Sequence, residues 1–175
     1  MTKLGRPQAS EYGAYYETYI RLVPEEDVLA ALTRQNEDTL ATLREVSEQA
    51  SLRRYAPGKW SLRELVGHLT DAERIFSYRG LRFARNDRTE LPGFDQDPYV
   101  AAASFDRIPF AELLEQFRLL RQANLLLFRG LAEEAWMRSG VASQKEMSVR
   151  AVAYTIVGHE RHHLKVVRER YLTTA

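Results

Sequence analysis

The sequence of 175 residues contains no cysteine. This absence excludes disulfide bonds, thiolate metal ligands and a cysteine nucleophile, so any bound metal must be held by histidine, carboxylates or water. The sequence also lacks the run of about 18 apolar residues that a membrane-spanning helix needs, and its start, MTKLGRPQAS, lacks the apolar stretch of a signal peptide. We therefore expect a cytoplasmic protein that does not enter a membrane.

An excess of charge of one sign is missing as well. The 25 basic residues are interleaved with 24 acidic ones, which gives a formal net charge of +1 and no electrostatic footprint for nucleic acid. Arg79, Arg82, Arg85 and Arg88 recur at a helical spacing. Acidic residues lie among them, which favours a solvated helix face over a binding strip.

Apolar residues are plentiful, at 45% of the chain, and the length suits one folded domain over residues 1–175. Apolar side chains recur at three- and four-residue steps in four segments, which predicts four amphipathic helices. The first runs from about Pro24 to Val46, and the second begins at Ser61, where S-x-x-E has the spacing of a capping box. The third runs from about Pro109 to Gly130 and the fourth from near Ser148 to Tyr171. Four such helices predict an all-α four-helix bundle.

Two long connectors, residues 84–104 and 131–147, separate the predicted helices. The first contains two prolines and a glycine, and it is long enough to cross one end of a bundle or to cover a site. The tyrosine-rich stretch YGAYYETYIRLV near the start predicts a short helix outside the bundle, with its rings in packing contacts rather than in a ligand site.

Three of the four histidines lie within five positions of the fourth predicted helix. At about 100° per residue, His163 falls within the apolar stripe of this helix and His159 at its edge, whereas His162 points away. His159 and His163 are therefore adjacent on consecutive turns and face inward. The remaining histidine, His68, flanks the apolar stripe of the second helix and can point into the same bundle.

Three neutral imidazoles from two helices form a common site for a divalent transition metal, with the remaining positions open to water or substrate. The alternative is that each inward histidine is an ordinary core residue. The coincidence of three inward histidines in a chain with only four favours a metal site at His68, His159 and His163.

Other polar residues accompany these histidines. Asn36 and Asn124 lie on the apolar stripes of the first and third helices, where their amides line a pocket or join the helices by hydrogen bonds. Glu160, Glu73 and Asp71 are candidate acceptors for the free ring N–H of a ligating histidine, or else ordinary partners in salt bridges.

With these histidines in place, the sequence resembles the DinB/YfiT-like family of metal-binding four-helix proteins. The resemblance rests on KWSLRELVGHLTDAERIFSYRGLRFARND, GFDQDPYV and VGHERHHLKVVRERY and covers nearly the whole chain. It implies an up-down-down-up bundle with a long crossover between the second and third helices, a homodimer, and a zinc or nickel ion bound by His68, His159 and His163. The similarity is strongest to the YfiT-type branch, which implies a metal-dependent hydrolase or a transferase that uses bacillithiol-type small thiols.

Three functional hypotheses follow. The first is a thiol S-transferase that joins a low-molecular-weight thiol to an electrophilic small molecule, because a metal with an open position can stabilise a thiolate. The second is a metal-dependent hydrolase, which also needs a base to move protons, with Glu160 or Glu73 as the candidates. The third is a non-catalytic metal-binding interaction module.

Overall fold

The structure, a computed structural model, describes residues 4–173. Four long helices dominate it: α2 (Val28–Arg44), α3 (Leu62–Ala84), α5 (Phe110–Arg129) and α6 (Val149–Val166). Two short helices, α1 (Glu17–Ile20) and α4 (Gln96–Ala103), and two strands, β1 (Ser139–Ala142) and β2 (Lys145–Ser148), are added to them. Single turns of 3-10 helix cover Ala9–Glu11, Ala14–Tyr16, Ala50–Leu52, Phe105–Arg107 and Glu133–Met137, and a π-helical turn, Val167–Tyr171, continues α6.

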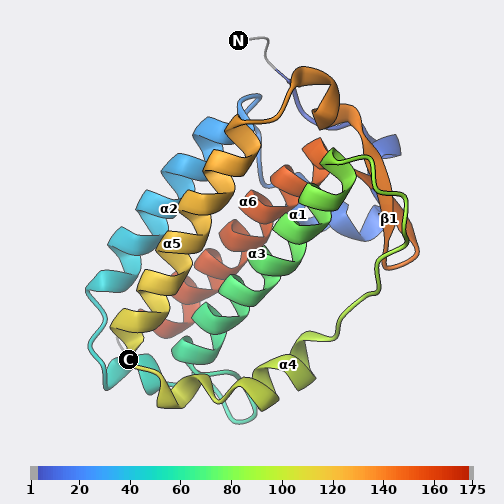
Figure 1. Cartoon of the computed structure of the whole chain (residues 1–175). Coiled ribbons are helices and arrows are strands. Elements are labelled where there is room, and N and C mark those ends of the chain that lie inside the picture. The colour runs from blue at the N-terminus through green and yellow to red at the C-terminus, as the bar shows by residue number, and fades with distance from the viewer. Residues whose placement is uncertain (1–3, 174–175) are drawn as a thin grey trace.

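The four long helices form a bundle in which α3 packs against both α5 and α6, and α2 packs against the same two helices from the other side (Figure 1). α3 and α5 run in the same direction, so the chain must return along the bundle between them through residues 85–109, which carry α4 (Figure 1). The predicted all-α, up-down-down-up bundle with a long crossover is therefore confirmed. α1 packs against α6 outside the bundle, as the tyrosine-rich sequence predicts.

Local capping explains where the helices begin and end. The Ser61 hydroxyl accepts from the Glu64 amide at 3.0 Å while the Glu64 carboxylate accepts from the Ser61 amide at 2.7 Å, which is the predicted capping box of α3. α2 begins four residues later than predicted, because the Asp27 carboxylate accepts from the Ala30 amide at 3.0 Å and so caps the helix there. Pro109 precedes α5 and Gly130 ends it, as predicted.

A β-hairpin lies mostly within the second predicted connector, although the sequence predicts no strand there. β1 and β2 pair antiparallel, and a two-residue turn joins them at Ser143 and Gln144, whose φ angles are 53° and 62°. Leu91 of the crossover pairs with the hairpin: its amide donates to the Val141 carbonyl at 2.9 Å, and its carbonyl accepts from the Ser143 amide at 3.0 Å. The hairpin and the crossover therefore form one continuous wall beside the bundle.

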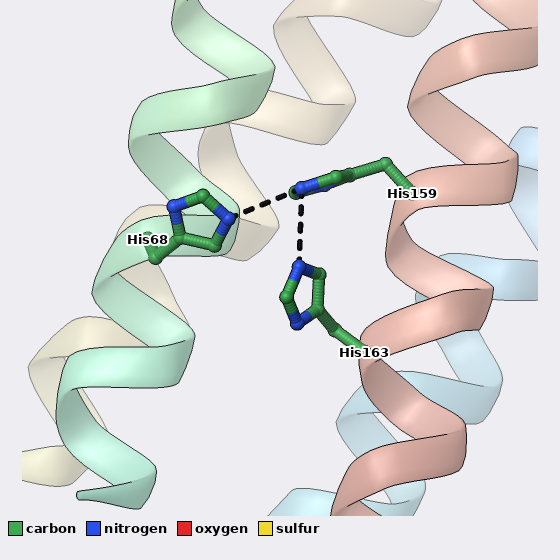
Figure 2. A group of neighbouring side chains, drawn as sticks. All are labelled: His68, His159 and His163. Atoms are coloured by element: carbon green, nitrogen blue, oxygen red, sulfur yellow. Dashed lines mark hydrogen bonds between the residues drawn. The ribbon is translucent and has the colours of Figure 1, made fainter. Parts of the chain in front are cut away.

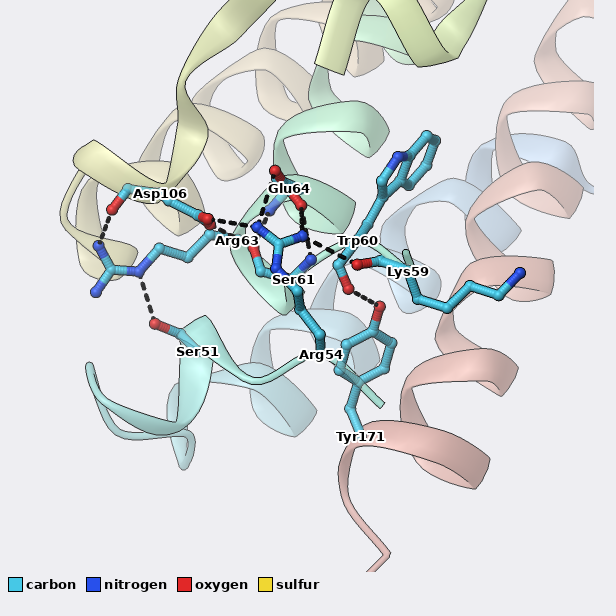
Figure 3. Close-up of polar contacts among 9 residues, drawn as sticks. All are labelled: Ser51, Arg54, Lys59, Trp60, Ser61, Arg63, Glu64, Asp106 and Tyr171. Atoms are coloured by element: carbon cyan, nitrogen blue, oxygen red, sulfur yellow. Dashed lines mark hydrogen bonds and ion pairs between the residues drawn. The ribbon is translucent and has the colours of Figure 1, made fainter. Parts of the chain in front are cut away.

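At the opposite end of the bundle, a buried arginine fastens the end of the crossover to the start of α3 (Figure 3). Arg63 donates from Nη1 to the carbonyls of Asp106 and Ile108 at 3.1 and 2.8 Å and from Nε to the Ser51 hydroxyl at 2.7 Å. Arg54 binds the Asp106 carboxylate at 2.8 Å. These contacts fix the beginning of the helix that carries His68.

The interior consists of two apolar clusters with polar residues between them. One cluster surrounds Phe76, Phe128 and Val152, and the other surrounds Leu43, Leu65 and Leu113. Every long helix contributes buried polar side chains at the level between the clusters: Gln35, Asn36, Thr39, His68, Glu73, Arg121, Asn124, His159 and Glu160. Buried polar groups cost free energy unless they are paired, so this polar layer is where function is expected.

No helix within residues 4–173 is long and apolar enough to cross a membrane.

Candidate metal centre

Three histidine rings meet in the polar layer. His68 projects from α3, and His159 and His163 project from consecutive turns of α6 (Figure 2). The Nε2 atom of His159 lies 3.1 Å from Nε2 of His68 and 3.2 Å from Nε2 of His163. His68 and His159 are buried and His163 is partly buried. His68, about ninety positions before the other two histidines, thus directs its Nε2 atom to the same place as they do.

The three nitrogens suit a metal ion. One nitrogen from each ring lies within 4.8 Å of the other two. Nitrogens bound tetrahedrally at the usual zinc distance stand roughly 3.4 Å apart, so small ring rotations would complete such a set. Within residues 4–173 no fourth histidine, aspartate or glutamate joins the group, which is typical of an open metal site rather than a closed structural one.

The electrostatic surroundings keep these rings neutral. Burial lowers the pKa of His68 to about 4, and burial together with the neighbouring His68 and His162 lowers the pKa of His163 to about 3. Burial, reinforced by the other imidazoles, holds the pKa of His159 well below its usual value. At neutral pH the rings therefore present lone pairs rather than N–H⁺ groups, as metal ligands must.

Aromatic rings fix the orientation of the histidines. Trp60 lies beside His68 with 4.9 Å between ring centroids, and its carbonyl accepts a 2.7 Å hydrogen bond from the Tyr171 hydroxyl (Figure 3). Tyr19 of α1 meets His159 edge to face at 5.2 Å. The π-helical turn that follows α6 and the short helix α1 therefore both serve to hold the site.

A cavity of about 400 Å³ opens onto His68 and His159. Its walls come from five parts of the chain: the N-terminal tyrosines, α3, the segment that leads into α4, the hairpin turn and α6. The remaining lining residues are Tyr15, Tyr16, Tyr19, Phe76, Arg79, Phe94, Asp95, Gln96, Asp97 and Ser143. A small molecule can therefore reach the histidines from the side on which the hairpin and the crossover meet.

Beside the histidines lies a buried cluster of charges. Arg121, fully buried, donates to both carboxylate oxygens of Glu73 at 2.8 and 2.7 Å and to Glu160 at 2.7 Å. The Asn124 amide donates to Glu73 at 3.0 Å. A void of about 10 Å³ separates these two carboxylates from His159, which is near the lower limit for one water molecule.

The other residues singled out in the sequence lie as follows. Asn124 joins its helix to α3 through Glu73, whereas Asn36 is buried with its Oδ1 atom unpartnered among the described residues. Asp71 binds Arg74 at 3.0 Å on the side of α3 that is partly exposed. His162 is exposed, as the helical wheel predicts.

The structure places two arginines in the interior, although arginine ordinarily lies at the surface. Arg79 was expected on a solvated face with Arg82, but it is 2% exposed and lines the cavity. Arg121 was not singled out, although it lies four residues after Phe117 and three before Asn124 on the apolar stripe. This spacing on the apolar stripe could have predicted that Arg121 is buried and therefore needs a carboxylate partner. The tyrosines pack as expected and also line the cavity.

Known proteins similar to this chain include two whose names describe them as metal-dependent hydrolases. The family model described as the DinB superfamily matches residues 31–167. The protein "Putative metal-dependent hydrolase OB0413" of Oceanobacillus iheyensis is 26% identical over 129 residues, which are 73% of this chain and 73% of that protein. The fold is similar to that of YfiT from Bacillus subtilis, described as a probable metal-dependent hydrolase with an unusual four-helix bundle topology. The TM-score is 0.67 at 16% identity, over 93% of this chain and 91% of that one.

Proposed function

Because this chain belongs to the DinB superfamily, we propose that it is a metal-dependent enzyme for small molecules, with His68, His159 and His163 holding a zinc or nickel ion. The convergence of three neutral Nε2 atoms on one point carries the proposal. The metal-dependent names of the two similar proteins support it.

The reaction that the surroundings favour is transfer of a small thiol to an electrophile. A bound metal with an open position would supply acidity, lowering the pKa of a thiol so that the thiolate is the nucleophile at neutral pH. The thiol proton would pass to solvent, and the sulfur would form a bond to the electrophilic carbon as the bond from that carbon to the leaving group breaks. This chemistry needs no protein base at the site, because the thiol proton has already been lost. That fits a site in which Arg121 holds both buried carboxylates.

Hydrolysis of an ester or amide is the second candidate, supported by the names of the similar proteins. It requires a group that passes protons between water and the leaving group. Glu73 and Glu160 are the nearest buried carboxylates, but both are bound to Arg121. We therefore rank hydrolysis below thiol transfer. Turnover of ester or amide substrates without added thiol would reverse this order.

The first test is metal content. Elemental analysis of the purified protein is expected to find zinc or nickel near one equivalent, and His159→Ala is expected to remove it. His162→Ala is the matched control, because His162 neighbours the cluster in sequence yet is exposed. Equal metal content in His159→Ala and the wild type would contradict the proposed site.

The second test is activity. The metal-loaded protein is incubated with bacillithiol, glutathione or mycothiol and with an epoxide or a chlorobenzene electrophile. We expect thiol-dependent loss of the electrophile that His159→Ala lacks and His162→Ala retains. No rate above the His159→Ala background with any thiol would count against the transferase.

A non-catalytic metal-binding module is the third candidate. In that case a chelator would unfold the protein, and no thiol or electrophile would change the spectrum of a cobalt-substituted form. The cytoplasmic location and the homodimer remain predictions, which cell fractionation and light scattering of the purified protein would test.

A further inference from the structure

Four arginines are buried in the structure, and three of them have a carboxylate partner within residues 4–173. Arg63 binds Glu48, Arg121 binds Glu73 and Glu160, and Arg150 binds Glu11. The fourth, Arg79, has no ion pair among the described residues, although it is 2% exposed. A buried charge without a counter-charge costs free energy of folding, so we expect Arg79 to serve a function that offsets this cost.

The contacts of Arg79 hold its guanidinium in place without neutralising it. Nη2 donates to the Pro92 carbonyl at 3.0 Å and to the Ser143 hydroxyl at 3.1 Å, and Nη1 donates to the Tyr16 hydroxyl at 3.3 Å. Its carbon Cζ lies 5.7 Å from the centroid of the Phe76 ring. All of these partners are neutral. Nε donates to none of the described residues, so the guanidinium has donors to spare.

Arg79 lines the same cavity as His68 and His159. The Phe76 ring centroid lies 5.7 Å from Cζ of Arg79 and 6.0 Å from the centroid of His159. The guanidinium and the His159 ring are thus separated by at most the sum of these two distances. Both Arg79 and His68 belong to α3, eleven residues apart, and therefore lie on nearly the same face of the helix. One small molecule can reach both ends of the cavity.

We propose that Arg79 binds a carboxylate of the substrate, so that the cavity selects an elongated molecule with its reactive group at the histidines and one negative charge at the other end. This inference rests on the proposed function for the position of the reactive group. Arginine presents paired N–H donors that match the two oxygens of a carboxylate. Asp95 and Asp97, which also line the cavity, repel negative charge in proportion to its size, so a singly charged carboxylate is favoured over a doubly charged phosphate.

The probes for the test are 6-mercaptohexanoate and its methyl ester, which differ only in the charged end. Each is titrated into the cobalt-loaded protein, whose visible spectrum reports thiolate binding, and into the metal-free protein by calorimetry. We expect the acid to bind the wild type about tenfold more tightly than the ester, as a desolvated charged hydrogen bond implies. In Arg79→Gln the affinity for the acid should fall to that for the ester, while the affinity for the ester is unchanged.

Arg82→Gln is the matched control, because Arg82 lies one turn further along α3, binds Asp87 and does not line the cavity. It should keep the preference for the acid. Arg79→Lys should keep part of that preference, which gives a second reading if Arg79→Gln fails to fold. Shorter and longer mercapto acids, of three and eleven carbons, should bind less tightly than the six-carbon probe if the ends of the cavity set the length.

The outcomes separate this inference from the proposed function. If neither probe changes the cobalt spectrum, the open metal position is refuted, and the calorimetric comparison of acid and ester still decides the role of Arg79. If both probes change the spectrum but wild type binds them equally, the carboxylate site is refuted and the metal site stands. Equal loss of acid and ester binding in Arg79→Gln would indicate a purely structural arginine and would also refute the inference.

Discussion

Replacing Arg121 with leucine is expected to destabilise the protein strongly. Arg121 is 0% exposed, and its partners Glu73 and Glu160 are 3% and 1% exposed. Leucine fills much of the space but leaves both carboxylates in the interior without their cation. Arg121 also donates to the Leu32 carbonyl at 3.0 Å, and that acceptor would lose its partner as well.

The size of the loss in the free energy of unfolding depends on the two carboxylates that Arg121→Leu leaves unpaired. Removing one partner of a buried ion pair costs about 3–5 kcal/mol, because the remaining charge is uncompensated. Two stranded carboxylates put Arg121→Leu at the upper end, at about 5 kcal/mol, which is a large part of the stability of an ordinary domain. The triple variant Glu73→Gln/Arg121→Leu/Glu160→Gln removes the stranded charges and should recover more than half of the loss.

Urea denaturation followed by circular dichroism measures these differences, and its pH dependence gives a separate check. Burial and the charge of Glu73 raise the pKa of Glu160 above 4.5, while Arg121 opposes the rise, so the variant should raise this pKa further. A carboxyl with a raised pKa favours the fold below its unfolded pKa and opposes it as the pH rises through its folded pKa. The deficit of Arg121→Leu should therefore shrink between about pH 7 and about pH 5.

The control is Arg118→Leu on the same helix, whose partner Glu115 is exposed, and it should change stability little. A loss below about 1 kcal/mol for Arg121→Leu would refute the account of the buried charges. A triple variant no more stable than Arg121→Leu alone would show that shape, rather than charge, is what the arginine supplies.

Two further predictions concern stability. In Gly158→Ala the new Cβ would lie 2.1 Å from the carbonyl oxygen of Tyr19, so α1 must shift and thermal unfolding should reveal a loss of about 2 kcal/mol. Gly80→Ala, whose Cβ would meet only side chains at 3.4 Å, should be neutral or stabilising by up to about 1 kcal/mol, and an equal loss in both variants would contradict the crowding argument. The hydrogen bond from Arg161 lowers the pKa of Glu25 from 4.5 to about 2, so this pair stabilises the fold above pH 4.5 and ceases to do so as the pH falls toward 2. Glu25→Gln should therefore flatten the acid limb of the stability curve by at most about 1 kcal/mol, and an unchanged limb would show that the pair contributes nothing.

Features encoded by local spacing could be predicted from the sequence. The capping box at Ser61 and the end at Gly130 depend only on residues a few positions away, and the structure has both. The inward direction of His159 and His163 follows in the same way from helical periodicity. Predicting that these two histidines lie close to His68 also needs the order of the helices in the bundle. That order came from the family resemblance and not from helical periodicity.

Features that depend on distant partners were harder to predict. Arg79 and Arg121 carry charges that ordinarily lie at the surface, and nothing near Arg121 in the sequence shows that its partner Glu73 comes from 48 positions away. The hairpin was missed because its strands have only four residues each and its turn uses Ser143 and Gln144 rather than glycine or asparagine. Pairing with Leu91 stabilises these strands, and that contact too is remote in sequence.

The main-chain pairing of Leu91 with the hairpin has an evolutionary consequence. Hydrogen bonds between backbone groups place almost no demand on which side chains the paired residues carry. Phe94 and Gln96, which follow Leu91 and line the cavity, can thus be exchanged for other residues without breaking this pairing or disturbing the helices that hold the imidazoles. A lineage could therefore change which molecules enter the cavity while it inherits the same three histidines unchanged.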